Sequence, residues 1–192
     1  MTVVGLTGGI GSGKSTVSRL LEVMKIPVYI ADSESKRLTE TSQVIREKLT
    51  EKFGKDLYIN GKLNKTLLAS LIFGNEKNRI FVNSIIHPVV RNDFEQWKKQ
   101  NSQYPVAVIE TAILFETGYF KFVDISVTVA APEDLRIRRV ENREGWTRAG
   151  ILSRMQSQFT EEEKVRRSDY VIYNDDKQAL IPQVEKFLKV IL

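Results

Sequence analysis

The chain has 192 residues, of which 42% are hydrophobic and 28% charged, with a formal net charge of +5 and no cysteine. This length and composition suit a folded protein with a sizeable core and an inserted or appended lobe, and the lack of cysteine excludes disulfide frameworks and thiolate metal sites. We find no signal or transit pattern and no apolar run near the roughly 18 residues that cross a bilayer, so we expect a cytoplasmic protein without membrane partners. The positive charge favours anionic partners, either nucleic acid or a small phosphorylated molecule.

The predicted elements alternate between strands and helices along much of the chain. Residues 3–6 form a short apolar run typical of a buried parallel strand, and residues 17–24 carry apolar side chains at helical spacing. Further strands are predicted at residues 27–31, 106–109, 125–129 and 170–173, and the last is followed by an amphipathic helix. This order predicts a doubly wound α/β fold with a mostly parallel sheet of five strands.

Two segments interrupt this alternation. Residues 33–101 contain only helical patterns and one turn, Asn60-Gly61, which predicts a helical insertion after the second strand. His87 precedes a proline, so a joint between two helices is expected there. Residues 135–167 are basic and helical, with a capping box that begins at Thr160, and are expected to form a lid. The remaining residues, 1–32, 102–134 and 168–192, are assigned to the nucleotide-binding core.

The glycine-rich stretch at residues 8–15 satisfies G-x-x-x-x-G-K-[ST] between a predicted strand and a predicted helix, which is the context of a P-loop. In such a loop Lys14 reaches the β- and γ-phosphates, the Ser15 hydroxyl holds Mg²⁺, and Thr16 is placed to reach the α-phosphate. A dinucleotide-binding G-x-G-x-x-G motif does not fit, because its third glycine would fall on Lys14. The predicted nucleotide-binding residues are Gly9, Ile10, Gly11, Ser12, Gly13, Lys14, Ser15 and Thr16.

A small-molecule kinase needs a base near its acceptor. Asp32 follows the second predicted strand, and the carboxyl ends of strands line the ligand crevice of open α/β sheets. A carboxylate there can accept the proton of an acceptor hydroxyl. The alternative is that Asp32 only caps the following helix. A GTP switch is not supported, because no Asn-Lys-x-Asp stretch is present.

A kinase also needs cations over the transferring phosphoryl group. Arg136, Arg139 and Arg143 are spaced to share one face of a predicted helix, and Arg154 and Lys164 follow. A mobile lid would close these arginines over phosphates, whereas the alternative is a solvated basic face. Nucleic-acid binding is not expected, because no aromatic residues alternate with these cations.

Taken together, these features resemble the dephospho-CoA kinase family over almost the whole chain. The residues that carry the resemblance are the loop from Gly5 to Val17, Ala31-Asp32, Ile86-His87-Pro88, Leu114-Phe115-Glu116, Arg139, Arg143, Arg154, Gln158, and the stretch from Ser168 to Asn174. A P-loop alone marks only a superfamily, but this ordered set is far more specific.

The resemblance implies ATP and Mg²⁺ on the P-loop and transfer of the γ-phosphoryl group to the ribose 3′-hydroxyl of dephospho-CoA. It implies catalytic roles for Asp32, Lys14 and Arg139, and contacts of Arg139, Arg143 and Asn174 with ATP. It implies that the helical insertion, residues 33–101, binds the substrate. The residues it implies for the substrate are Thr7, Asp32, His87, Arg91 and Glu116. We expect a monomer that acts on small molecules and does not bind nucleic acid.

The chain departs from the family pattern at three positions. Glu110 stands where an aspartate is usual, Ala112 where a proline is usual, and Arg136 where a glutamine is usual. None of these changes removes a predicted catalytic group. Two alternatives stay open: a P-loop kinase that acts on a nucleoside or nucleotide, and a nucleotide-gated binding protein that has no acceptor.

Overall fold

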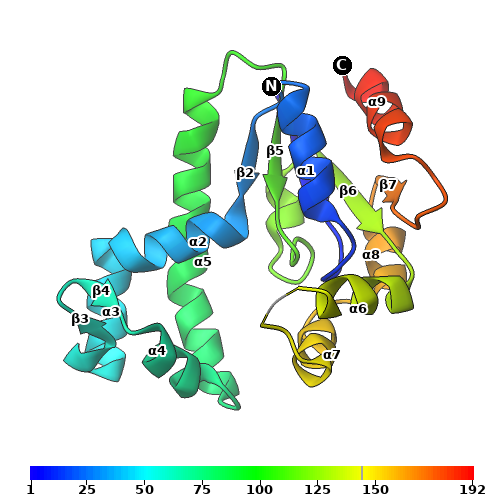
Figure 1. Cartoon of the computed structure of the whole chain (residues 1–192). Helices are drawn as coiled ribbons and strands as arrows, with labels where there is room; N and C mark the ends of the chain where they lie inside the picture. Colours follow the sequence, from blue (N-terminus) through cyan, green and yellow to red (C-terminus); the bar gives the residue numbers. More distant parts are fainter. Residues whose placement is uncertain (144) are drawn as a thin grey trace. The chain divides into compact units, whose positions relative to one another are not determined.

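The structure is a computed structural model that describes residues 1–143 and 145–192 (Figure 1). The chain divides into two compact units, one formed by residues 1–30 and 101–192 and the other by residues 31–100. Residues 135–143 and 145–167 belong to the first unit, and their assignment to a separate lid stays a prediction. None of the described helices is both long and apolar enough to cross a membrane.

The first unit is built on a sheet of five parallel strands in the order β2-β5-β1-β6-β7. The strands are β1 (Thr2–Thr7), β2 (Val28–Ile30), β5 (Val106–Glu110), β6 (Ile125–Ala130) and β7 (Tyr170–Tyr173). Their near-continuous apolar runs reflect burial on both faces of the sheet. The predicted α/β fold is therefore confirmed.

Helices cover both faces of this sheet. On one face α1 (Lys14–Val23) and α9 (Leu180–Ile191) pack against a core that includes Val127 and Val129 of β6. Thr128 lies between these two valines, so its side chain points to the opposite face. There its hydroxyl donates to the carbonyl of Lys164 in α8 (Glu161–Arg167). The unit is thus a layer of helices on each side of a central sheet.

The remaining elements of the first unit are the short 3₁₀ helix η2 (Tyr119–Phe122), α6 (Glu133–Glu141) and α7 (Arg148–Gln156). The prediction that Arg143 shares one helical face with Arg136 and Arg139 is wrong, because α6 ends at Glu141. Asn142 and Gly145 are poor helix formers, and Gly145 has a φ of +84°, so the helix does not continue.

The second unit is mostly helical. Its elements are α2 (Ala31–Thr41), α3 (Gln43–Phe53), η1 (Lys55–Leu57), β3 (Tyr58–Ile59), β4 (Lys62–Leu63), α4 (Lys65–Ile72) and α5 (Glu76–Gln100). The prediction of helices alone is wrong in one detail, since β3 and β4 form an antiparallel hairpin. Asn60 and Gly61 both have positive φ at its turn, which suits the twist of a two-residue hairpin.

Pro88 lies inside α5, which runs on from Glu76 to Gln100. The predicted joint between two helices at His87-Pro88 is therefore wrong. Proline removes one backbone N–H and crowds the carbonyl four residues earlier, here that of Ser84. The helix persists because Val82, Ile86 and Phe94 on both sides of the proline are buried, and this packing outweighs the local preference.

Replacing Pro88 by alanine should stabilise the protein by about 1–3 kcal/mol, because the new N–H can bond to the Ser84 carbonyl. Urea unfolding would measure the change. The matched control is Pro182→Ala, since Pro182 is the third residue of α9 and the first N–H groups of a helix have no intrahelical partner. An equal gain from both substitutions would contradict the explanation.

Candidate active site

The glycine loop follows β1, the central strand of the sheet, and leads into α1. The chain passes from β1 to β2 on one side of the sheet, whereas β6 and β7 lie on the other side. The loop therefore stands at a topological switch point, at the carboxyl end of the strand. Ligands of open α/β sheets bind at such points.

Gly11 and Gly13 of the loop have conformations and neighbours that exclude other residues. Gly11 has a φ of +80°, and an added Cβ would overlap the backbone carbonyl of Arg136. Gly13 has a φ of +96° as the N-cap of α1, and an added Cβ would overlap the side-chain amide of Asn174. The loop is thus enclosed from outside by residues distant in the sequence.

The N-terminus of α1 is suited to an anion. No described side chain caps it, and its first turn contains no acidic residue. Ser15 and Thr16 are exposed in that turn, so their hydroxyls are accessible. Lys14 folds back along the loop, with Nζ 3.0 Å from the Gly8 carbonyl oxygen. Backbone N–H groups, the helix dipole and an ammonium group are therefore combined at one end of the sheet, as phosphate binding requires.

Arg139 and Asn174 meet beside the loop. The Asn174 side-chain nitrogen donates to the Ser12 carbonyl at 2.8 Å. The Arg139 guanidinium donates to the Asn174 backbone carbonyl at 3.0 Å and to its side-chain oxygen at 3.3 Å. It also pairs with Asp176. Two residues that the resemblance assigns to ATP are thus brought to the glycine loop, while Arg143 lies exposed beyond α6.

Arg136 is buried against the loop, with 6% of its surface exposed. An added Cβ on Gly9 would overlap its guanidinium, and its Nε lies 3.5 Å from the Glu161 carboxylate. Burial raises the pKa of Glu161, although the Ala131 N–H and Arg136 act in the opposite direction. The guanidinium packs on Gly9 and links the loop to α8, so Arg136 is not part of a solvated basic face.

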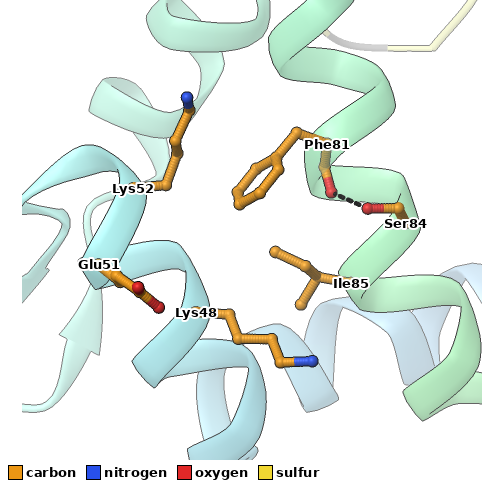
Figure 2. Close-up of a pocket in the computed structure, with 6 residues that line it drawn as sticks. All are labelled: Lys48, Glu51, Lys52, Phe81, Ser84 and Ile85. Atoms are coloured by element: carbon orange, nitrogen blue, oxygen red, sulfur yellow. Dashed lines mark hydrogen bonds between the residues drawn. The ribbon is translucent and has the colours of Figure 1, made fainter.

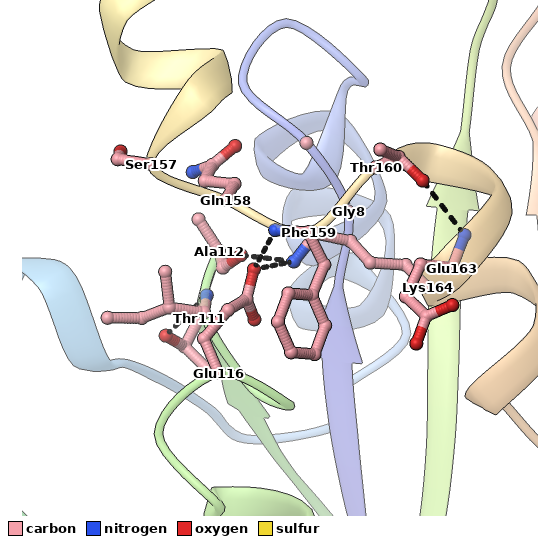
Figure 3. Close-up of polar contacts among 12 residues, drawn as sticks. Gly8, Thr111, Ala112, Glu116, Ser157, Gln158, Phe159, Thr160, Glu163 and Lys164 are labelled. Atoms are coloured by element: carbon pink, nitrogen blue, oxygen red, sulfur yellow. Dashed lines mark hydrogen bonds and ion pairs between the residues drawn. The ribbon is translucent and has the colours of Figure 1, made fainter.

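Lys164 is also buried, and its exposed fraction is 0%. Its Nζ lies 2.6 Å from the Glu116 carboxylate and 2.8 Å from the Ala112 carbonyl oxygen (Figure 3). The same Glu116 oxygen accepts the Phe159 backbone N–H at 2.7 Å. Burial lowers the pKa of Lys164, and the Glu116 carboxylate partly offsets this. Sequence reasoning missed the pair because a lysine within a basic run looks solvated.

Other residues of interest in the first unit lie near strand ends. Thr7 is the last residue of β1, and its buried hydroxyl has no hydrogen-bond partner among the described residues. Glu110 is the last residue of β5, is buried, and lies in register with Leu6 and Ile30. Glu110, which stands where the family usually has aspartate, thus places a carboxylate on a longer side chain at the carboxyl ends of the strands.

Asp32, His87 and Arg91 belong to the second unit. Asp32 is the second residue of α2 and is exposed, so it does not precede the helix as an N-cap would. His87 and Arg91 are four residues apart on α5, which places them on one face of the helix. Burial lowers the pKa of His87, so its imidazole is uncharged at neutral pH.

A pocket of about 510 Å³ opens between α3 and α5 of the second unit. Figure 2 shows Phe81 and Ile85 of α5 facing Lys48 and Lys52 of α3 across it. The Lys52 ammonium lies 5.6 Å from the centre of the Phe81 ring. Glu51 also lines the pocket, so its wall combines apolar side chains with charges of both signs.

Comparison with known proteins identifies the family. The family model described as Dephospho-CoA kinase matches residues 2–179. The chain belongs to the dephospho-CoA kinase family. Curated dephospho-CoA kinases from Bacteroides fragilis and Porphyromonas gingivalis are 46% and 40% identical to it, over 94% and 100% of this chain and 88% and 95% of theirs. A crystal structure from Thermus thermophilus matches with a TM-score of 0.84 at 32% identity, covering 99% of this chain and 95% of that one.

Membership of the dephospho-CoA kinase family makes the protein an ATP-dependent kinase that phosphorylates dephospho-CoA in coenzyme A synthesis. Its substrates are therefore small molecules. This decides between the alternatives that the motifs left open, because neither a nucleoside kinase nor a binding protein without an acceptor is supported. The predicted family and enzyme class are confirmed.

We predict that Gly11→Ala weakens ATP binding by at least about tenfold, because the new Cβ would force the loop away from the Arg136 carbonyl. Titration calorimetry with ATP would measure this. Gly61→Ala is the matched control, since Gly61 has the same φ of +80° but nothing within 4 Å of an added Cβ. Unchanged ATP affinity in Gly11→Ala would show that the close packing does not shape the loop.

Proposed function

We propose that Asp32 accepts the proton of the ribose 3′-hydroxyl of dephospho-CoA while that oxygen attacks the γ-phosphorus of ATP, giving coenzyme A and ADP. The observation that carries this proposal is the common sheet edge. β1 and β2 belong to one parallel sheet, the phosphate loop follows β1, and Asp32 comes two residues after the last residue of β2. Parallel strands end at the same edge, where α/β enzymes collect their reacting groups.

The glycine loop and Lys14 would hold the β- and γ-phosphates and stabilise the charge that spreads over the transferring oxygens. Ser15 would hold Mg²⁺, which when bound neutralises phosphate charge. Its exposed hydroxyl is an oxygen ligand of the kind that Mg²⁺ prefers. Mg²⁺ usually keeps several waters and is held partly by substrate phosphates, so Ser15 would supply only part of its coordination.

The cations around the loop would complete the donor site. Arg139 is held in place by Asn174, and this arrangement supports a contact of Arg139 with the triphosphate and of Asn174 near the adenine. Arg143 is exposed on the segment that follows α6 and is available to the same phosphates. The predicted lid over residues 135–167 would bring it there and exclude water from the reaction.

The acceptor would be held by residues of the second unit. Dephospho-CoA carries a diphosphate, which suits the guanidinium of Arg91, an exposed residue. The uncharged imidazole of His87 can donate one hydrogen bond and accept another. Thr7 and Glu116 are proposed as further substrate contacts. All the groups invoked come from one copy of the chain, so we propose that it acts as a monomer.

A product assay tests the acceptor. The purified protein is incubated with Mg²⁺, ATP and, in separate reactions, dephospho-CoA, nucleosides and nucleoside monophosphates, and the products are measured by mass spectrometry. We expect coenzyme A from the first reaction only. Phosphorylation of a nucleoside at a higher rate, or consumption of ATP without a phosphorylated product, would contradict the proposal.

Asp32→Asn should lower kcat for coenzyme A formation by about 10²–10⁴-fold, the usual contribution of a positioned base. ATP affinity should stay near the wild-type value, because the donor groups are unchanged. Asp56→Asn is the control, since Asp56 is an exposed aspartate of the same unit. Near wild-type kcat in Asp32→Asn would remove Asp32 from the proton transfer.

A further inference from the structure

Gln158 contacts the glycine loop directly. Its side-chain oxygen Oε1 accepts the backbone N–H of Ile10 at a distance of 3.0 Å. The two residues are 148 positions apart in the sequence, and both belong to the first unit. This is the bond by which the segment between α7 and α8 reaches the loop. In the sequence Gln158 was only one of the residues that carry the family resemblance, and no role was assigned to it.

The backbone around Gln158 is fixed on its C-terminal side. The N–H of Phe159, the next residue, donates to Glu116, whose carboxylate is paired with the buried Lys164 (Figure 3). Thr160 then caps α8, with its hydroxyl accepting the Glu163 N–H at 3.2 Å. The Lys164–Glu116 pair thus holds the chain from which the Gln158 side chain extends to the loop. A group anchored in this way loses little freedom when it binds a ligand.

The contact with Ile10 determines how the Gln158 amide is oriented. The Ile10 N–H is a donor, so the glutamine must present its oxygen to it and direct its nitrogen elsewhere. Nε2 carries two N–H groups and makes no hydrogen bond to the described residues. The side chain therefore holds a pair of donors next to the phosphate-binding loop.

The position of the Lys14 ammonium indicates that the first half of the loop lies toward the γ-phosphate. The Lys14 ammonium, which in P-loops reaches the β- and γ-phosphates, lies 3.0 Å from the Gly8 carbonyl oxygen and 3.4 Å from that of Gly9. Ile10 is the next residue. The α-phosphate, by contrast, is expected at the first turn of α1, beside Thr16. A donor held at Ile10 is thus closer to the transferring group than to the rest of the nucleotide.

We propose that Gln158 donates a hydrogen bond from Nε2 to the γ-phosphoryl group of ATP, while its Oε1 keeps the bond to the Ile10 N–H. Gln158 would then distinguish ATP from ADP and stabilise the charge on the group in transfer. This inference rests on the proposed function for its effect on turnover, but not for its effect on nucleotide binding.

Gln158→Glu separates this role from a purely structural one. Glutamate has the same shape and still offers an oxygen to the Ile10 N–H, but it replaces the two donors by a negatively charged oxygen. If Gln158 only holds the segment to the loop, the variant keeps its activity. The control is Gln156→Glu, since Gln156 is exposed at the end of α7 and receives the same charge two residues away.

The experiment measures the affinities of the full-length variants for Mg-ADP and for the non-hydrolysable analogue Mg-AMP-PNP by calorimetry, together with kcat for coenzyme A formation. In Gln158→Glu we expect AMP-PNP affinity and kcat to fall by about 10- to 100-fold, with ADP affinity within about twofold of wild type. Gln156→Glu should leave all three within about twofold. Melting temperatures of both variants check that they fold.

Three outcomes would overturn the proposal: wild-type AMP-PNP affinity and kcat in Gln158→Glu, an equal loss of ADP and AMP-PNP affinity, or the same selective loss in Gln156→Glu. The second outcome would mean that Gln158 only maintains the shape of the loop. The third would mean that a negative charge added anywhere near the loop has the same effect. Binding of the two nucleotides needs no acceptor. A wild-type protein that makes no coenzyme A would therefore contradict the proposed function without deciding the role of Gln158.

Discussion

The close packing of the glycine loop against its outer neighbours is the constraint on which the nucleotide-binding unit depends. The Arg136 backbone and the Asn174 side chain occupy the space that side chains on Gly11 and Gly13 would need. Because these neighbours come from α6 and from the residue after β7, the loop takes its shape only when the sheet is complete. A loop whose shape is held from outside needs little reordering when phosphates bind.

A buried ion pair also connects the loop to the basic stretch at residues 135–167. Lys164 has no exposed surface, and it orders Glu116 and the backbone of Phe159. Removing one member of such a pair would leave an uncompensated charge in the interior, which typically costs about 3–5 kcal/mol. The pair connects α8 with the segment after β5, and through Gln158 it reaches the glycine loop. A stretch that reads as a uniform basic surface therefore contains the structural anchor of the phosphate site.

The sequence was informative wherever local chemistry dominates. Apolar runs located the five strands of the parallel sheet, and the glycine spacing located the loop, because burial on both faces and positive φ restrict which residues can occupy those positions. It failed at Pro88, at Arg143 and at the hairpin around Asn60. In the first case burial of Val82, Ile86 and Phe94 overrides a local preference, and no local pattern reports such packing. Arg143 was misplaced because α6 ends two residues before it, and the hairpin was missed because its strands are very short. The pattern of apolar residues does not define such short features.

The α/β fold, the nucleotide-binding loop and the family follow from the sequence alone, because each depends on residue types at fixed spacings along the chain. Which cations are buried and which are exposed could be seen only in the folded structure. Arg136 and Lys164 lie in the interior, whereas Arg143 and Arg154 face solvent, although all four belong to one basic stretch. The difference arises because a long cationic side chain can be buried only where the fold supplies a carboxylate, as Glu161 and Glu116 do here. Glu161 is distant in the sequence from Arg136, and Glu116 is distant from Lys164. Each pair therefore forms only in the folded protein.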